Sequence, residues 1–356
     1  MKNFSNVILD WYDENRRSLP WRESKDAYRI WLSEVILQQT RVAQGLPYYL
    51  NFIKTFHTVN DLAQAPEEAV LRLWQGLGYY SRARNLHKCA KVVSEQYNGV
   101  FPSTYDELLA LPGIGPYTAA AIASIAFNRK VAVVDGNVYR VLARIFGIDT
   151  DISSTEGKKE FQELASRLIN DKNPGDHNQA VMEFGATLCT PSPRCEECPF
   201  RKQCVAYAKG LIDKLPVKEK KIKKRTRYFY YFILREGNTI AMKKRTGRDI
   251  WNGLYEFYLI ETAADKKLKA IVESDLLLKN ISENRFIESG TIRHLLSHQE
   301  LIIRFFEIDL SKDFVKRNDK VLNELSFVAF EQAEVFPKPV VISKYLTAIA
   351  TKAQSH

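Results

Sequence analysis

The sequence contains no apolar run long enough to cross a membrane as a helix. Its longest apolar stretch, around Ala119–Phe127, is far shorter than the roughly 20 residues that a bilayer requires. The residues from Met1 to Asn6 lack the apolar core of a signal peptide. We therefore expect a cytoplasmic protein of bacterial type that has no membrane partner.

Cysteine is scarce and unevenly placed. Of the five cysteines, Cys89 stands alone in a helical pattern and is expected to be a small buried apolar residue. The other four form the run Cys189-x5-Cys195-x2-Cys198-x5-Cys204. Disulfides suit neither an intracellular chain nor such tight clustering, so metal binding is the leading interpretation. A compact run of four thiolates favours a [4Fe–4S] cluster, while zinc, which usually prefers two separated pairs, stays as the alternative.

Acidic residues are outnumbered by basic ones. Lys and Arg total 52 against 42 Asp and Glu, which gives a net charge of +10. This surplus favours a polyanionic partner, because each neutralised phosphate releases condensed counterions. A basic, well-solvated surface is an equally good explanation of the charge taken alone.

Val-rich strand patterns are nearly absent from the first two-thirds of the chain. Apolar stripes predict amphipathic helices over Asp26–Val42 and Gly136–Phe146, and Thr104 and Glu107 have the spacing of a capping box. We therefore expect an all-α region over residues 1–213. It is followed by a linker at 214–226, where Lys214–Arg225 holds seven basic residues and one acid.

Strand patterns begin after this linker. Tyr228–Leu234 and Thr239–Lys243 flank Glu236-Gly-Asn, which predicts a hairpin. Further strands are expected over Leu254–Ile260 and Leu301–Ile308, with a helix near Lys266–Leu277. Residues 227–356 therefore form a second domain of the α+β class.

The segment Leu111-Pro-Gly-Ile-Gly-Pro-Tyr-Thr-Ala119 predicts two helices joined by a tight hairpin. Gly113 and Gly115 allow the turn and expose backbone N–H groups at the start of the second helix. Such N–H groups and a positive helix end bind one phosphate well. A plain connector with glycines for packing is the alternative.

Two carboxyl groups are candidates for catalysis. Glu34 has mostly apolar neighbours on its helix, which predicts burial, a raised pKa and a role as general acid. Asp135 lies where a helix N-cap belongs, and the helix N–H groups are expected to lower its pKa and keep it ionised. An acid and an anion of this kind break N-glycosidic bonds through an oxocarbenium-like sugar.

Several motifs together resemble the adenine DNA glycosylases of the MutY family, within the endonuclease III superfamily of helix–hairpin–helix proteins. They are Leu19-Pro-Trp-Arg22, Ser33-Glu-Val-Ile-Leu-Gln-Gln-Thr40, Gly76-Leu-Gly-Tyr-Tyr-Ser-Arg82 and Val134-Asp-Gly-Asn137. The resemblance implies a bilobal helical region, with a six-helix part at about 23–130 and a cluster-bearing part formed by 1–22 and 131–213. The family's first cysteine spacing is usually one residue longer than the one here.

Tyr117 separates two branches of this superfamily. In the endonuclease III branch a lysine at this place attacks the sugar and forms a Schiff base. Tyrosine cannot do so, and the resemblance therefore implies a monofunctional glycosylase. It would remove adenine mispaired with 8-oxoguanine or guanine from double-stranded DNA in base excision repair, as a monomer near the nucleoid.

The resemblance also implies roles for individual residues. Glu34 would protonate adenine N7, and Asp135 would stabilise the sugar cation or a covalent intermediate. Tyr117 and Asn137 would position Asp135 and the sugar. The remaining residues would form an adenine pocket for a flipped base, namely Trp21, Arg22 and Gln179, or would enter the duplex beside the lesion, namely Gln39, Thr40 and Tyr79.

The second domain resembles the family's lesion-recognition domain, a relative of Nudix hydrolases. The acidic helix that binds catalytic magnesium in Nudix enzymes does not follow Phe257, so nucleotide hydrolysis is not expected. The family reads 8-oxoguanine with a Phe-Ser-His loop, and this chain has Leu296-Ser297-His298. Ser297 and His298 would keep the polar contacts, while Leu296 replaces the aromatic residue. Two polar residues in an ordinary turn are the alternative.

Three other functions compete with this interpretation. An endonuclease III-like glycosylase and lyase is opposed by Tyr117 and by the second domain. A sensor that only binds mispairs is opposed by the pair Glu34 and Asp135. A Nudix-type pyrophosphatase is opposed by the missing acidic helix.

Overall fold

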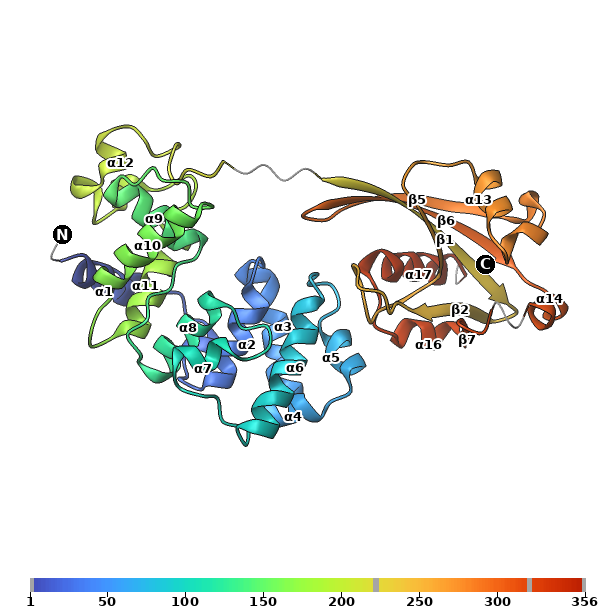
Figure 1. The fold of residues 1–356 in the computed structure, drawn as a ribbon, viewed down its shortest axis with the longest axis horizontal. Helices are drawn as coiled ribbons and strands as arrows, with labels where there is room; N and C mark the ends of the chain where they lie inside the picture. Colours follow the sequence, from blue (N-terminus) through green and yellow to red (C-terminus); the bar gives the residue numbers. More distant parts are fainter. Residues whose placement is uncertain (1–2, 220–223, 319–321, 354–356) are drawn as a thin grey trace. The chain divides into compact units, whose positions relative to one another are not determined.

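The computed structural model describes residues 3–219, 224–318 and 322–353. The chain divides into two compact units (Figure 1). The helical unit comprises Met1–Ala65 and Asn85–Lys221, and the mixed unit comprises Pro66–Arg84 and Ile222–His356. The sequence places residues 66–84 in the helical region, whereas their contacts group them with the C-terminal residues. No helix in the described part of the chain is long and apolar enough to span a bilayer.

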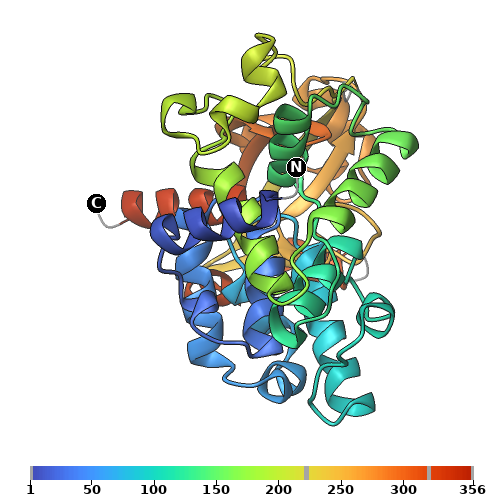
Figure 2. The ribbon, with the colours of Figure 1, turned by 90° about the vertical axis from the view of Figure 1, so that its left-hand side faces the viewer.

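The helical unit consists of α-helices joined by short turns (Figure 2). Its α-helices are α1 (Phe4–Asn15), α2 (Ala27–Leu37), α3 (Val42–Thr55), α4 (Val59–Gln64), α6 (Ser81–Gln96, whose first turn belongs to the mixed unit), α7 (Tyr105–Leu109), α8 (Pro116–Phe127), α9 (Gly136–Phe146), α10 (Thr155–Leu168), α11 (Pro174–Thr187) and α12 (Val205–Ala208). Short 3-10 helices lie at Pro20–Arg22, Cys195–Glu197 and Arg201–Gln203. The expected all-α character of this region is confirmed.

One core of the helical unit joins its N-terminal helix to the helices that precede the cysteines. Phe4 and Ile8 of α1 are buried together with Val141 of α9, Phe161 of α10 and Phe184 of α11. The apolar stripe of α9 accounts for this packing, because residues three and four apart share one helix face. The burial holds α9, which follows Asp135, against α11.

The predicted helix Asp26–Val42 is shorter than expected. Asp26 caps the start by accepting the Tyr28 N–H, and α2 ends at Leu37. Gln39 then has a φ of 55°, a left-handed conformation that interrupts the helical hydrogen bonds. The Thr40 N–H closes the turn on the Leu37 carbonyl at 3.1 Å, and α3 starts at Val42. The apolar pattern continues across this break and therefore does not reveal it.

The predicted basic linker is only partly a linker. Leu215 is buried in the core of the helical unit, and the Val217 carbonyl accepts the Ile152 N–H at 3.1 Å. The chain therefore packs on the helical unit through Val217. Residues 220–223 lie outside the described residues, and the first strand begins at Arg225.

The mixed unit is built on a sheet whose described strands have the order β3-β2-β1-β6-β5, with β4 paired to β1 and β7 paired to β2. The strands are β1 (Arg225–Glu236), β2 (Thr239–Lys244), β3 (Tyr255–Glu256), β4 (Tyr258–Thr262), β5 (Ile287–Leu295), β6 (Gln299–Asp309) and β7 (Ser326–Ala329). The expected hairpin of β1 and β2 is confirmed by the pair Glu236 and Thr239. Strands β1 and β6 are parallel, with Arg225 beside Gln299.

Helices cover both faces of this sheet, as Figure 1 shows. The α-helices of the unit are α5 (Glu67–Leu73), α13 (Leu268–Ser274), α14 (Lys312–Arg317), α16 (Phe330–Val335) and α17 (Val340–Ala353), and 3-10 helices lie at Leu278–Asn280 and Glu283–Arg285. On one face, Tyr345 of α17 stacks on Phe305 with ring centroids 4.2 Å apart. On the other face, Tyr230 and Phe232 pack with Ile271 of α13. Burial on both faces explains why β1 is apolar without alternation.

The hairpin between α7 and α8 depends on one of its two glycines. Gly113 has a φ of +75°, and a Cβ there would lie 2.5 Å from the Asn85 Cβ. Gly115 is the N-cap of α8 with a φ of −93°, and a Cβ there would meet nothing within 4 Å. Only the first position requires glycine.

We expect Gly113→Ala to lower the free energy of unfolding by about 1–3 kcal/mol, because both its backbone and its contact with Asn85 become strained. The matched variant Gly115→Ala should cost less than about 1 kcal/mol, the difference between glycine and alanine at an N-cap. Urea denaturation of the two variants measures this difference. Equal losses of stability would contradict the assignment.

Candidate active site

A cavity of about 780 Å³ opens in the helical unit between α2, α8, α9 and α11. It brings together residues that are far apart in the sequence. The predicted residues that line it are Trp21, Arg22, Glu34, Thr40, Tyr117, Asp135, Asn137 and Gln179. Glu34 and Asp135, whose proximity the sequence cannot establish, therefore face one space.

Glu34 lies in the last turn of α2. Burial raises the pKa of Glu34 to about 7, although a hydrogen bond from Tyr117 lowers it. The Tyr117 hydroxyl donates to the Glu34 Oε2 at 2.6 Å. A carboxyl group with this pKa holds a proton in a large fraction of molecules near neutrality, as a general acid must. The resemblance implies that Tyr117 positions Asp135, whereas its hydroxyl donates to Glu34.

Asp135 is the N-cap of α9. Its Oδ1 accepts the N–H groups of Asn137 at 2.9 Å and of Val138 at 2.8 Å. Burial nevertheless raises the pKa of Asp135, against these hydrogen bonds, so the expected lowering of its pKa is wrong in direction. The helix N-terminus only partly offsets the desolvation. N–H donors hold both carboxylate oxygens, and they stabilise the anion against part of this desolvation.

Asn137 is oriented by a residue that the sequence analysis missed. Arg140, one turn along α9, donates through Nη2 to the Asn137 Oδ1 at 2.8 Å. A guanidinium group only donates, so the Asn137 amide nitrogen must face the other way. It donates to the Asp135 Oδ2 at 2.9 Å. Arg140 also donates to the Cys189 carbonyl at 2.7 Å, which connects Asn137 to the cysteine segment.

Glu183 is a second residue that the sequence analysis missed. It is buried and forms ion pairs with Arg17 at 2.6 Å and Arg22 at 2.7 Å. Burial alone would raise the pKa of Glu183, but the hydrogen bonds from Arg17 and Arg22 hold it at about 2. A glutamate among Val181, Met182 and Phe184 on α11 was the available signal. Glu183 holds Arg22 in place, and its single negative charge is shared between the two guanidinium groups.

Two further predicted residues also face the cavity. The Gln179 Oε1 accepts a long hydrogen bond of 3.5 Å from the Tyr12 hydroxyl. Trp21 is buried, with its ring edge-to-face on Tyr49 at 5.2 Å. Gln39, by contrast, is exposed in its left-handed turn and does not line the cavity.

The four clustered cysteines line one small cavity in the helical unit, with Ile145 and Phe184 among its apolar walls. Arg144 lies against it and donates to the Cys189 Sγ at 3.6 Å. Burial raises the pKa of Cys198 to about 11, and a bound cation would favour its thiolate. Among the described residues, no three His, Cys, Asp or Glu side chains are arranged to hold a single metal ion. A cluster that binds each sulfur through a different iron fits four thiols around one apolar space.

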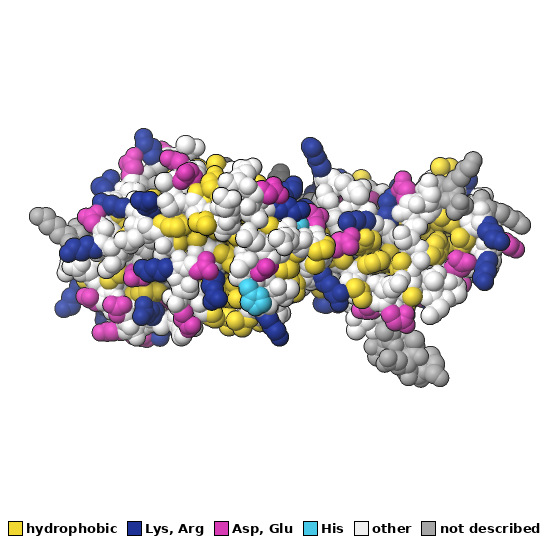
Figure 3. Space-filling model, turned by 90° about the horizontal axis from the view of Figure 1, so that it is seen from below, with side chains coloured by type: hydrophobic (Ala, Val, Ile, Leu, Met, Phe, Trp, Pro, Cys, Tyr) yellow, Lys and Arg dark blue, Asp and Glu magenta, His cyan; other side chains and the backbone are white. Residues whose placement is uncertain are grey.

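Basic side chains do not gather into one patch on the visible face of the helical unit. Figure 3 shows Lys and Arg side chains interspersed there with Asp, Glu and apolar ones. The hairpin offers a more local anion site, because no side chain of the described residues caps the start of α8 at Gly115. Its free N–H groups suit one phosphate.

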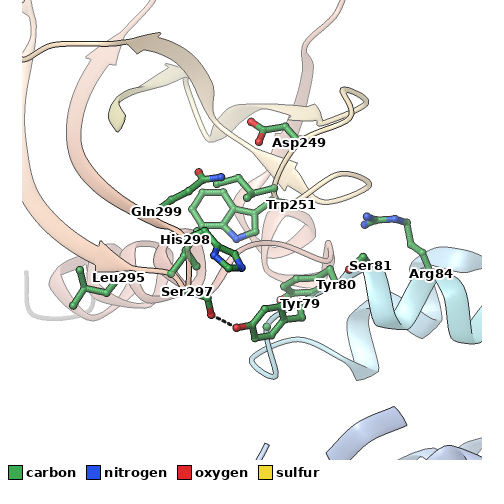
Figure 4. Close-up of a pocket in the computed structure, with 13 residues that line it drawn as sticks. Tyr79, Tyr80, Ser81, Arg84, Asp249, Trp251, Leu295, Ser297, His298 and Gln299 are labelled. Carbon is green, nitrogen blue, oxygen red and sulfur yellow. Dashed lines mark hydrogen bonds between the residues drawn. The ribbon is translucent and has the colours of Figure 1, made fainter. Parts of the chain in front are cut away.

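A second pocket, of about 490 Å³, lies wholly within the mixed unit. It brings together Tyr79, Ser297 and His298, and Figure 4 shows the Tyr79 hydroxyl hydrogen-bonded to the Ser297 hydroxyl. Ser297 and His298 lie in the turn between β5 and β6, which the Leu296 N–H closes on the Gln299 carbonyl at 2.8 Å. Tyr79 is exposed and has a φ of 48°. The predicted lesion contacts from two distant segments thus share one pocket.

Comparisons with known proteins agree with this geometry. Residues 32–167 match the HhH-GPD superfamily of base excision DNA repair proteins, and residues 230–348 match the NUDIX domain. The adenine DNA glycosylase of Buchnera aphidicola subsp. Baizongia pistaciae is 35% identical over 97% of this chain and 96% of its own length. The adenine DNA glycosylase of Homo sapiens is 47% identical over 57% of this chain and 39% of its own length.

Solved structures resemble the helical part of the chain. A thermostable thymine-DNA glycosylase is 33% identical, with a TM-score of 0.54 over 58% of this chain and 96% of that one. An endonuclease III trapped in a covalent intermediate with DNA is 24% identical, with a TM-score of 0.51 over 59% of this chain and 96% of that one. The second likeness concerns the fold alone.

Tyr117→Phe should raise the pKa of Glu34 above about 7, because the lost O–H donor stabilised the carboxylate. Carbon-13 NMR of labelled glutamate carboxyls measures this pKa, and Glu34→Gln identifies the signal by removing it. Glu163→Gln, at an exposed position of α10, should leave the signal unchanged. A lower pKa in Tyr117→Phe would show that the hydroxyl does not act through Glu34.

Proposed function

The chain belongs to the adenine DNA glycosylase family, and we propose that this DNA repair hydrolase removes adenine paired with 8-oxoguanine, or with guanine, without cutting the strand. The observation that carries the proposal is the cavity in which Glu34, Tyr117 and Asp135 meet. It supplies a carboxyl group protonated near neutrality, a carboxylate held by N–H donors, and no lysine among its lining residues.

In the proposed reaction, an adenine flipped out of the duplex enters the cavity. Glu34 gives its proton to N7 of adenine, and the N-glycosidic bond breaks with its electron pair on the base. The Asp135 carboxylate stabilises the oxocarbenium-like sugar that remains. Water then adds to C1′ and gives up one proton, which restores the acid. Breaking the bond requires no electron transfer.

The adenine itself would be recognised at the far wall of the cavity. Gln179 lines the cavity with an amide that can both donate and accept, which suits the edge of adenine. Arg22 is held by Glu183 and therefore offers donors in a fixed direction. Ordered polar groups of this kind reject bases that leave them unpaired.

We propose that the four cysteines hold a [4Fe–4S] cluster, with zinc as the minority alternative. The cluster would supply cross-links between residues 189 and 204 and no step of base removal. The chain's own residues connect this segment to the cavity. Arg140 joins the Cys189 carbonyl to Asn137, and Arg144 donates to the Thr190 carbonyl at 2.6 Å and to that of Leu215 at 3.1 Å.

The opposing purine would be read in the mixed unit. Ser297 and His298 are two of the polar residues in the pocket that also contains Tyr79, and we propose that they contact 8-oxoguanine. Leu296, in place of the family's phenylalanine, also lines this pocket and supplies apolar contact. The protein would act on DNA as a monomer.

Single-turnover assays on a duplex with one 8-oxoguanine:A pair test the reaction. Wild type should release adenine and give strand breaks only after alkali. Its rate should fall as the pH rises through about 7, because Glu34 then loses the proton it must donate. Glu34→Gln should lose about two to four orders of magnitude in rate, the usual contribution of a general acid. Asp135→Asn should be similarly impaired.

The exposed Glu163→Gln variant is the control and should keep the wild-type rate. Strand breaks before alkali would mean that the enzyme is a lyase. Tight binding of the mispair without base loss would leave a sensor.

The purified protein should contain iron and inorganic sulfide and absorb broadly in visible light. Cys198→Ser should lose this absorbance and melt at a lower temperature, because one ligand of the cross-link is missing. Cys89→Ser is the matched control and should keep the cluster, since Cys89 is buried outside the four-cysteine cavity. Zinc found in place of iron, in protein purified without oxygen, would refute the cluster.

A further inference from the structure

Arg227, on β1, is a buried arginine with carboxylate partners on two sides. Its guanidinium donates to both oxygens of Glu261, at 2.7 and 2.6 Å, and to both oxygens of Asp249, at 2.9 and 2.5 Å. It also donates to the Gln299 Oε1 at 2.8 Å. Five hydrogen bonds thus join β1 to three other segments of the mixed unit.

Two of these partners lie in the walls of the second pocket. Asp249 belongs to the Trp251 loop, which we define as Arg245–Leu254, and Gln299 ends the Ser297 turn, which we define as Leu296–Gln299. Both residues line the pocket, as do Trp251 and His298 (Figure 4). Arg227 lies behind this wall, and it does not line the pocket itself. A single guanidinium therefore connects the two segments that face each other there.

The Trp251 loop is strained. Trp251 has a φ of 61°, a region that bulky residues rarely adopt, and such strain costs about 1–3 kcal/mol. The loop is closed at its base, where the Gly253 N–H donates to the Arg245 carbonyl at 2.7 Å. At its tip, Asp249 is held by Arg227 and by Arg245, the latter at 2.8 Å. These ion pairs oppose relaxation of the loop.

We propose that Arg227 is a positioning residue for lesion specificity, which holds the Trp251 loop and the Ser297 turn at the separation that fits 8-oxoguanine. This inference rests on the proposed reading of 8-oxoguanine in this pocket. Arg227 touches neither the base nor the reacting atoms. It acts through Asp249 and Gln299, so its loss should affect the choice of opposing base and leave adenine cleavage intact.

Lysine cannot replace Arg227 in this role. A lysine ammonium group carries the same charge, but it lacks the planar fork that engages two carboxylates and an amide together. Arg227→Lys therefore preserves the charge balance of the site and loses the geometry. Asp249→Asn preserves the shape of the loop residue and weakens its hold on Arg227.

The experiment compares single-turnover rates of the full-length protein on 8-oxoguanine:A and G:A duplexes. We divide the rate on 8-oxoguanine:A by the rate on G:A. In Arg227→Met and Arg227→Lys, this ratio should fall by about tenfold to a hundredfold, because the groups that contact the base are misplaced. The rate on G:A should stay at the wild-type value. Asp249→Asn should reduce the ratio in the same direction.

Arg304→Met is the matched control, because Arg304 also forms an ion pair on this sheet, with Asp265 at 2.8 Å, but does not line the pocket. It should keep the wild-type ratio. Thermal melting distinguishes a positioning role from a loss of folding. The rate ratio must fall in Arg227→Lys or Asp249→Asn while that variant keeps the melting temperature of wild type. If all three variants at Arg227 and Asp249 keep the ratio, or lose it only on unfolding, the inference is wrong. If wild type itself does not prefer 8-oxoguanine:A, the proposed function fails first.

Discussion

The chemistry that we propose for this protein depends on the burial of two carboxyl groups in one cavity. Water would leave both Glu34 and Asp135 ionised at neutral pH, and two anions could not act as acid and stabiliser. Burial raises the pKa of both groups. The helix N-terminus and Asn137 supply N–H donors only to Asp135, whereas Glu34 receives one hydroxyl. Because Glu34 has fewer hydrogen-bond donors than Asp135, its anion is less stabilised, and we infer that Glu34 holds the proton.

This arrangement requires charge compensation around the cavity. Arg17 and Arg22 surround the buried Glu183, so positive side chains can line a space that would accept an uncharged base in the proposed reaction. A buried pair is costly to break, because the remaining charge has no partner. The positive charge of Arg140 partly compensates the charge of the Asp135 carboxylate. Arg140 also donates a hydrogen bond to the Cys189 carbonyl. The cysteine segment is therefore part of the support of Asn137, and through it of Asp135.

The mixed unit differs from the helical unit in that it presents polar groups on a rigid sheet. Strand β1 is buried on both faces, and α13 and α17 pack on the sheet that contains it. Near the start of β1, the buried Arg227 donates hydrogen bonds to Asp249 of the Trp251 loop and to Gln299 of the Ser297 turn. Residues 66–84 contribute Tyr79 to the same pocket. In the proposed function, this pocket gives the domain that matches the NUDIX model a role in recognition.

The sequence by itself determined the helical class of the first region, the hairpin at Gly113, the four-cysteine run and the candidates Glu34 and Asp135. These follow from local patterns: periodicity, capping, spacing and residue type. Only the tertiary structure decided what depends on contacts between distant segments. It ended α2 at Leu37, directed Tyr117 to Glu34 and revealed Glu183. Burial also outweighed the local helix effect at Asp135, because desolvation depends on everything that surrounds a group, and a linear pattern contains only its neighbours in the chain.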